Sequence, residues 1–170
     1  MRLSIKALTG LGGSALATLT CSAVLFGAHA SDAHAYEHLI YVNSVTDRCL
    51  AALGNSVVVT PVGCSGYPPA TDWTQSGMGN GGVRLQNRAT GTCVDMSSLG
   101  LRMFGCQRAF GPYAVYQSWR VHQDQPGITR LQAFWGGGCL ANYDTSLRLA
   151  GCTTPGHAGY KNQTWLKYRW

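Results

Sequence analysis

From residue 39 onward, short apolar stretches are separated by turn-forming residues. Apolar and polar side chains alternate, as they do along a half-buried strand, at 83–86, 99–103, 147–149 and 165–168, and three valines stand together at 57–59. Glycine-rich clusters between these stretches mark turns, at 79–82, 125–127 and 136–138. The pattern predicts roughly twelve short strands, and it contains no helical stripe longer than two turns.

The first thirty residues follow a different pattern. Arg2 and Lys6 precede an uncharged, mostly apolar run that ends in Ala28-His29-Ala30, and a second small-x-small sequence follows at Ala33-His34-Ala35. A basic start, an apolar middle and an Ala-x-Ala end are typical of a secretory signal peptide. We therefore predict a signal peptide at 1–30, cleaved after Ala30 or Ala35, and a short N-terminal tail at 31–38.

Two alternatives to a cleaved signal peptide remain. The apolar run could be a membrane anchor, but glycine, serine and threonine dilute it and no basic stop-transfer flank follows. Cys21 could carry a lipid, although Thr18-Leu19-Thr20 departs from the usual small-residue lipobox. No later stretch is long and apolar enough to span a bilayer, so we expect a secreted, extracellular protein without a membrane span.

Two cysteines and a tryptophan recur three times with nearly constant spacing. The three sets are Cys49, Cys64 and Trp73, then Cys93, Cys106 and Trp119, then Cys139, Cys152 and Trp165. Equivalent residues lie 42 to 46 positions apart, and a glycine precedes each second cysteine. This periodicity predicts one domain at 39–170 made of three repeats, at about 39–82, 83–127 and 128–170.

An even number of cysteines in an exported chain indicates disulfides. The repeat favours one bond within each unit, namely Cys49–Cys64, Cys93–Cys106 and Cys139–Cys152. Zinc is the alternative for paired cysteines, but separations of 13 to 15 lack a short Cys-x-x-Cys knuckle. A unit of about 45 residues cannot bury a core alone, so three units must share one. Three units are too few for a propeller, and the glycines argue against helical repeats.

The repeat resembles the ricin-type (ricin B-like) β-trefoil lectins over about residues 39–170. Gln117-Ser118-Trp119 and Gln163-Thr164-Trp165 match the Gln-x-Trp motif of that family, whereas Thr71-Asp72-Trp73 keeps only the tryptophan. The resemblance implies an all-β trefoil with about four strands in each of three lobes. It also implies a secreted carbohydrate-binding module whose partners are glycans or polysaccharides.

In such lobes an aspartate after the first cysteine binds sugar hydroxyls, and an aromatic ring before the second cysteine stacks on the sugar. The second repeat matches best, with Asp95, Phe104 and Gln117, but Tyr116 stands where asparagine is usual. The third repeat keeps Asn162 and Gln163 and has alanines at the aspartate and aromatic positions. The resemblance therefore implies carbohydrate-binding residues at Asp95, Phe104, Tyr116, Gln117, Asn162 and Gln163.

Each candidate also has a purely structural explanation. Asp95 could cap a turn, Phe104 could be part of the core, and Asn162 could hydrogen-bond a turn. The first repeat has lost the whole set, with Ala51, Val62 and Thr71 at these positions. The alternative function is therefore a protein-interaction trefoil with degenerate sugar sites, acting as the binding or adaptor subunit of a toxin or as an inhibitor of a secreted enzyme.

Charge and motifs argue against several other functions. Without Arg2 and Lys6 the chain has 11 basic and 7 acidic residues, and the arginines form no run, so no nucleic-acid groove is expected. A glycosidase needs two facing carboxylates, and no spacing suggests such a pair. No Ser/His/Asp signature, HExxH sequence, phosphate loop or dinucleotide motif occurs. We predict a protein that is not an enzyme and needs no cofactor or metal.

Overall fold

A computed structural model of the protein describes residues 37–169. The predicted signal peptide and most of the predicted tail lie outside the described residues. The described part holds twelve strands and three short helices. In chain order they are β1 (Leu39–Asn43), β2 (Leu50–Leu53), β3 (Ser56–Val59), α1 (Pro68–Thr71), β4 (Trp73–Gly77), β5 (Val83–Asn87), β6 (Thr92–Ser97), β7 (Gly100–Gly105), η1 (Ala114–Gln117), β8 (Trp119–Gln125), β9 (Ile128–Ala133), β10 (Cys139–Tyr143), β11 (Ser146–Ala150), η2 (Lys161–Gln163) and β12 (Trp165–Arg169).

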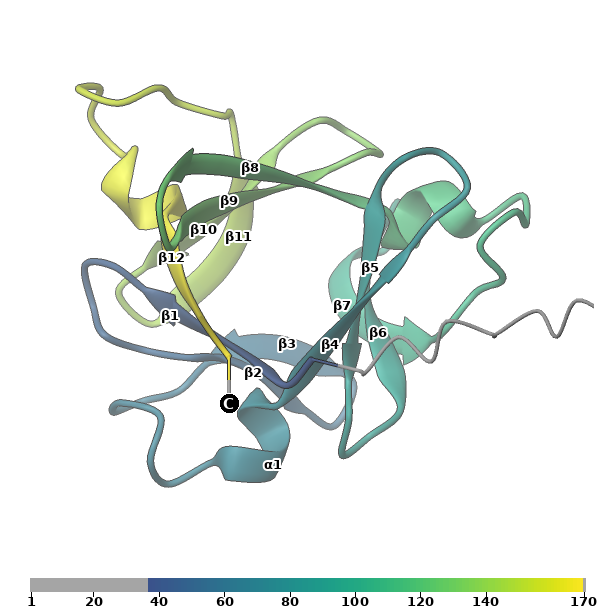
Figure 1. The fold of residues 1–170 in the computed structure, drawn as a ribbon, viewed down its shortest axis with the longest axis horizontal. Coiled ribbons are helices and arrows are strands. Elements are labelled where there is room, and N and C mark those ends of the chain that lie inside the picture. The colour runs from purple at the N-terminus through teal and green to yellow at the C-terminus, as the bar shows by residue number, and fades with distance from the viewer. Residues whose placement is uncertain (1–36, 170) are drawn as a thin grey trace, which may run out of the picture. The chain divides into compact units, whose positions relative to one another are not determined.

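Four strands come from each repeat, and the first and fourth strands of the three repeats form a closed ring. The ring runs β1–β4–β5–β8–β9–β12 and returns to β1, with every pair antiparallel. The pairing of β1 with β12 closes it, from Leu39 opposite Arg169 to Asn43 opposite Trp165. Closure leaves no free edge among these six strands, which removes the usual liability of an open sheet. The three lobes are visible in Figure 1.

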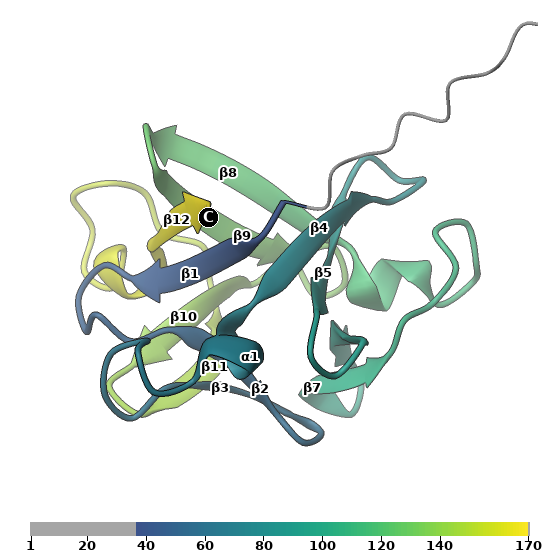
Figure 2. The same cartoon turned by 60° about the horizontal axis from the view of Figure 1, so that its bottom comes forward.

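The second and third strands of each repeat form a hairpin outside this ring. The three hairpins are β2–β3, β6–β7 and β10–β11, each joined by a two-residue turn. In Figure 2, β2, β3, β7 and β11 of these hairpins lie in the lower part of the view, below β8 and β12 of the ring. Hairpins of neighbouring repeats touch, and the Met103 N–H donates to the Asn55 carbonyl at 2.9 Å. The expected all-β fold of three four-stranded repeats is therefore confirmed.

The three tryptophans begin β4, β8 and β12 and are fully buried in one shared core. Each indole N–H donates to the carbonyl of the residue after the first cysteine of its own repeat. These bonds are Trp73 to Leu50 at 3.0 Å, Trp119 to Val94 at 3.2 Å and Trp165 to Leu140 at 3.1 Å. A buried indole needs such an acceptor, so each tryptophan fixes its own hairpin against the core.

The three disulfides pair as the repeat predicted. They join Cys49 to Cys64, Cys93 to Cys106 and Cys139 to Cys152, with Cα–Cα distances of 5.0 to 5.3 Å. Each bond ties the start of a hairpin to the loop that leads to the next tryptophan. One end of each loop is therefore covalently fixed to its hairpin.

Two details of the strand prediction differ from the structure. Leu99 does not open a strand but lies in the two-residue turn between β6 and β7, and β7 begins at Gly100, whose φ of 88° favours glycine where the chain leaves the turn. In repeat 1 the residue paired with Cys49 is Thr60, whose N–H and hydroxyl contact the backbone of Cys49. Val62 therefore does not occupy the aromatic position, because two extra residues separate the hairpin from Cys64.

Candidate functional site

An open pocket of about 450 Å³ lies beside the hairpin of repeat 2, between β6, β7 and the loop that precedes β8. We call it the repeat-2 pocket. Its lining residues are Asp95, Ser97, Ser98, Leu99, Arg102, Phe104, Gln107, Tyr113 and Tyr116. Three of the residues that the sequence suggested for sugar binding, Asp95, Phe104 and Tyr116, are thus brought together in one place.

Asp95 forms the polar floor of this pocket. It lies in β6 directly opposite Arg102 in β7, and its residue is only 3% exposed. Arg102 Nε donates to Asp95 Oδ1 at 3.2 Å, and Gln117 Nε2 lies 3.4 Å from Asp95 Oδ2. A buried carboxylate requires such partners, because an unpaired buried charge is costly. Asp95 is therefore held in a fixed orientation beneath the opening.

Aromatic rings form the walls. Phe104 is 44% exposed, so it is not a core residue, and the Arg102 guanidinium carbon lies 4.4 Å from its ring centroid. Tyr113 and Tyr116 are stacked with their centroids 6.1 Å apart, and Tyr116 meets the edge of Trp135 at 5.7 Å. Flat, exposed rings beside a few fixed polar groups are typical of small-ligand sites.

Gln117 lies behind the pocket and is fully buried. Its Oε1 accepts from the Gln107 N–H at 2.8 Å, and its Nε2 donates to the Gly105 carbonyl at 2.9 Å. Gln117 thus bridges the two residues that flank Cys106. Its contact with a ligand would be indirect, through Asp95 and the position of the loop.

Gln163 and Asn162 are not in the repeat-2 pocket. Gln163 is buried and repeats the bridge of Gln117, accepting from the Thr153 N–H at 3.0 Å and donating to the Gly151 carbonyl at 2.6 Å. The backbone carbonyl of Asn162 accepts from the Asn43 side chain at 3.0 Å. Gln163 therefore fixes a loop within the third lobe, and Asn162 links that lobe to the first repeat.

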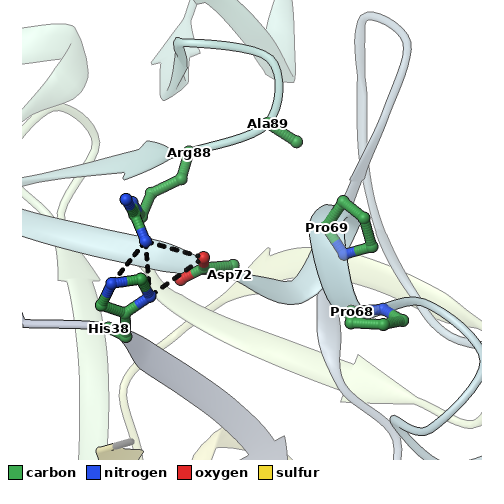
Figure 3. Close-up of a pocket in the computed structure, with 6 residues that line it drawn as sticks. All are labelled: His38, Pro68, Pro69, Asp72, Arg88 and Ala89. Carbon is green, nitrogen blue, oxygen red and sulfur yellow. Dashed lines mark hydrogen bonds and ion pairs between the residues drawn. The ribbon is translucent and has the colours of Figure 1, made fainter.

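A second cavity, of about 440 Å³, lies where repeats 1 and 2 meet (Figure 3). Its polar side consists of His38, Asp72 and Arg88, and its apolar side of Pro68, Pro69 and Ala89. His38 Nδ1 lies 3.2 Å and Arg88 Nη1 lies 3.3 Å from Asp72 Oδ2, so these three polar side chains are engaged with one another. No phenylalanine, tyrosine or tryptophan lines this cavity. It therefore lacks the stacking surface that the repeat-2 pocket has.

A partly buried cluster of Asp124, Arg130 and Tyr160 lies where repeats 2 and 3 meet, because Asp124 is in β8 of repeat 2 and the other two residues are in repeat 3. Arg130 Nη2 donates to Asp124 Oδ1 at 2.9 Å, and the Tyr160 hydroxyl donates to Asp124 Oδ2 at 3.1 Å. The hydrogen bond from Arg130 holds the pKa of the Asp124 carboxyl below its usual value. Burial and the hydrogen bond to Asp124 raise the pKa of Tyr160. Arg130 also donates to the Thr153 carbonyl at 2.9 Å, so the cluster anchors the loop after Cys152.

Sequence reasoning did not identify Arg102 as part of the site. The available signal was its place in the hairpin, because the two-residue turn of β6 and β7 puts it across from Asp95. Among residues 37–169, no group of three or more His, Cys, Asp or Glu side chains could hold a metal ion. Within the same range no helix is long and apolar enough to cross a membrane.

Solved structures superpose on most of this chain. A designed threefold-symmetric protein, ThreeFoil, superposes with a TM-score of 0.58 at 20% identity, covering 78% of this chain and 96% of that one. The fold is a β-trefoil. SeviL bound to the asialo-GM1 saccharide superposes with a TM-score of 0.60 at 9% identity, covering 78% of this chain and 97% of its own.

The cytolethal distending toxin of Haemophilus ducreyi contains the same trefoil fold. It superposes with a TM-score of 0.60 at 16% identity, covering 75% of this chain and 81% of that chain. No protein-family model matches the sequence, and no curated protein is a significant sequence relative. At these identities the superpositions establish the trefoil fold alone.

Proposed function

We propose that the protein is a secreted, non-catalytic carbohydrate-binding module of the ricin type, which binds glycan or polysaccharide in the repeat-2 pocket. The observation that carries the proposal is the convergence of Asp95, Phe104 and Tyr116 on one open pocket. A fixed carboxylate can accept hydrogen bonds from sugar hydroxyls, and exposed rings can cover the apolar face of a sugar. The trefoil of SeviL, which is bound to a saccharide, supports the same function.

The test is binding to a glycan array and to immobilised polysaccharides, with three variants compared to the wild type. Asp95→Asn preserves shape but removes the charge, and Phe104→Ala removes one wall. Each should weaken binding by about tenfold or more, since a hydrogen bond to a charged group and an aromatic contact are each lost. Phe110→Ala is the matched control, because Phe110 is 89% exposed and does not line the pocket.

The three possible outcomes test the position of the binding site and the sugar-binding function separately. Binding that falls with Asp95→Asn and Phe104→Ala, and stays within about twofold of the wild type with Phe110→Ala, supports both. Sugar binding unchanged by the two pocket variants would place the site elsewhere. No binding to any sugar would contradict the function itself.

A protein-interaction trefoil is the second candidate, because large apolar side chains are exposed in the β6–β7 turn and in the loop that precedes β8. Leu99, Phe110 and Tyr113 are 72%, 89% and 60% exposed. Exposed aromatic residues are typical anchors of protein interfaces. Under this function the partner is a toxin or enzyme chain, and the secreted protein should be isolated with it in a fixed stoichiometry. Phe110→Ala should then release the partner, which it would not do to a glycan.

A further inference from the structure

Of the two charged residues that line the repeat-2 pocket, Arg102 is more exposed to a ligand than Asp95. The Asp95 side chain is 4% exposed and that of Arg102 is 30% exposed. Both carboxylate oxygens of Asp95 already face protein donors, namely Arg102 Nε and Gln117 Nε2. A ligand in this pocket therefore meets a guanidinium first and a carboxylate second.

Arg102 is held in place with donors to spare. Its Nε is bonded to Asp95 at 3.2 Å, and its guanidinium carbon packs over Phe104 at 4.4 Å. Among residues 37–169, its Nη1 and Nη2 make no hydrogen bond. These two nitrogens carry four N–H donors in one plane, and this geometry matches the two oxygens of a carboxylate.

The charges around the pocket favour an anionic ligand. Asp95 is the one acidic residue that lines it, and that charge is balanced by Arg102. A second arginine, Arg84, donates from Nη1 to the carbonyl of Gln107 at 2.7 Å and so lies against the pocket wall. Arg108 follows Gln107 in the same loop and is exposed. The local balance is three arginines against one aspartate.

We infer that the repeat-2 pocket binds acidic glycans, with Arg102 pairing with a carboxylate carried by the sugar while Tyr113 and Tyr116 cover the ring. The inference rests on the proposed function and names its ligand class. Repeat 3 supplies an internal contrast: Arg148 occupies the register position of Arg102, but Ala141 is opposite it and the guanidinium carbon lies 4.1 Å from the Tyr143 ring centroid.

The experiment measures binding to two matched pairs of ligands: polygalacturonate and its methyl ester, and sialyllactose and lactose. Dextran sulfate is measured as a further ligand, so that the affinity for a sulfated glycan can be compared with the affinity for the carboxylated ones. The acidic member of at least one pair should bind about tenfold tighter, because a charge-assisted bidentate contact is added. That preference should weaken as ionic strength rises, since an exposed ion pair is screened by salt.

Variants assign the preference to Arg102. Arg102→Lys keeps a cation beside Asp95, so the fold is retained, but it loses the planar fork, and the preference should fall to about threefold or less. Arg148→Lys is the matched control and should leave the preference unchanged. A preference that persists in Arg102→Lys, or tighter binding of dextran sulfate than of either carboxylate, would overturn the assignment.

The remaining outcomes distinguish this inference from the function on which it rests. Binding of neutral glycans through the repeat-2 pocket, with no gain for acidic ones, overturns the inference and leaves the proposed function standing. Absence of binding to every sugar tested overturns both.

Discussion

Repeats 2 and 3 hold their last strands in the same way and differ on the outer face of their hairpins. Gln117 and Gln163 make the same bridge across the second cysteine, and Trp119 and Trp165 make the same bond to their hairpins. Every one of these side chains is buried. The inward-facing contacts are thus repeated, because a shared core constrains each lobe to the same geometry.

The outward-facing positions are not repeated. Asp95 and Phe104 of repeat 2 correspond in register to Ala141 and Ala150 of repeat 3. Repeat 3 instead has Arg130, which pairs with Asp124 of repeat 2 and anchors the loop after Cys152 through the Thr153 carbonyl. The comparison teaches that the three lobes share one scaffold and that a candidate binding surface is built on one of them.

The largest effects should come from the shared scaffold and should be equal in the two repeats. Trp119→Ala and Trp165→Ala each remove a fully buried indole and its hydrogen bond, and each should lower the free energy of unfolding by about 3–5 kcal/mol. Urea unfolding followed by circular dichroism would measure this. A much smaller loss for one tryptophan would break the equivalence of the lobes.

The disulfides should show the same equality at a slightly smaller magnitude. The Cys93–Cys106 and Cys139–Cys152 bonds both span a sequence separation of 13. Replacing either pair by alanines should cost about 3 kcal/mol, because the unfolded chain regains the entropy of an open loop. Thermal unfolding of the two double variants should give matching shifts. A clear difference would mean that one loop is held mainly by its other contacts.

The hairpin arginines should then separate the repeats. Arg102→Gln leaves the buried Asp95 carboxylate with Gln117 alone and should cost about 2 kcal/mol. Arg148→Gln removes an exposed arginine whose guanidinium packs on the Tyr143 ring, and it should cost less than about 1 kcal/mol. Chemical unfolding of the two variants side by side would test the contrast. Equal losses of stability in the two variants would contradict the claim that the Arg102–Asp95 ion pair stabilises repeat 2.

The contribution of the Asp124–Arg130 ion pair to stability should be modest and should depend on pH. Asp124→Asn removes the charge that Arg130 stabilises and should cost about 1–2 kcal/mol at pH 7. The pKa of Asp124 is lower in the folded protein, so this contribution is complete above the unfolded value of about 4 and is lost as pH falls through the folded value. The melting temperatures of variant and wild type should therefore converge in acid.

Asp144→Asn is the control for this pH dependence. The Asp144 side chain is 82% exposed, and its ion pair with Arg48 has an N–O distance of 3.4 Å. Its replacement should change stability by less than about 0.5 kcal/mol at any pH, as is usual for surface ion pairs. A difference between wild type and Asp124→Asn that stays constant down to pH 3 would contradict the role given to Arg130.

The features that could be predicted from the sequence are those that occur in every repeat. The cysteine and tryptophan spacing predicted the trefoil and the disulfides, because a threefold core demands the same residue types three times. The gathering of Asp95, Phe104 and Tyr116 also followed from the family resemblance. Arg102 was missed, because nothing in its own spacing distinguishes it until the hairpin register puts it opposite Asp95.

The wrong details have local physical causes. Val62 was aligned by counting back from Cys64, but two additional residues in repeat 1 move the paired position to Thr60. The buried state of Gln117 and Gln163 could not be predicted either, because a family motif names a residue without saying which of its atoms face the solvent. In the structure, the side-chain amides of both glutamines are hydrogen-bonded to the backbone on either side of the second cysteine.

The placement of β12 has a consequence for how the protein can be made. β12 pairs with β1 on one side and with β9 on the other, so the ring stays open until residues 165–169 have joined it. During synthesis from the N-terminus, β1 can pair with β4 early, but its second pairing must wait for a strand more than a hundred residues away. A growing chain therefore cannot complete the ring, or cover the core from that side, until β12 has been made.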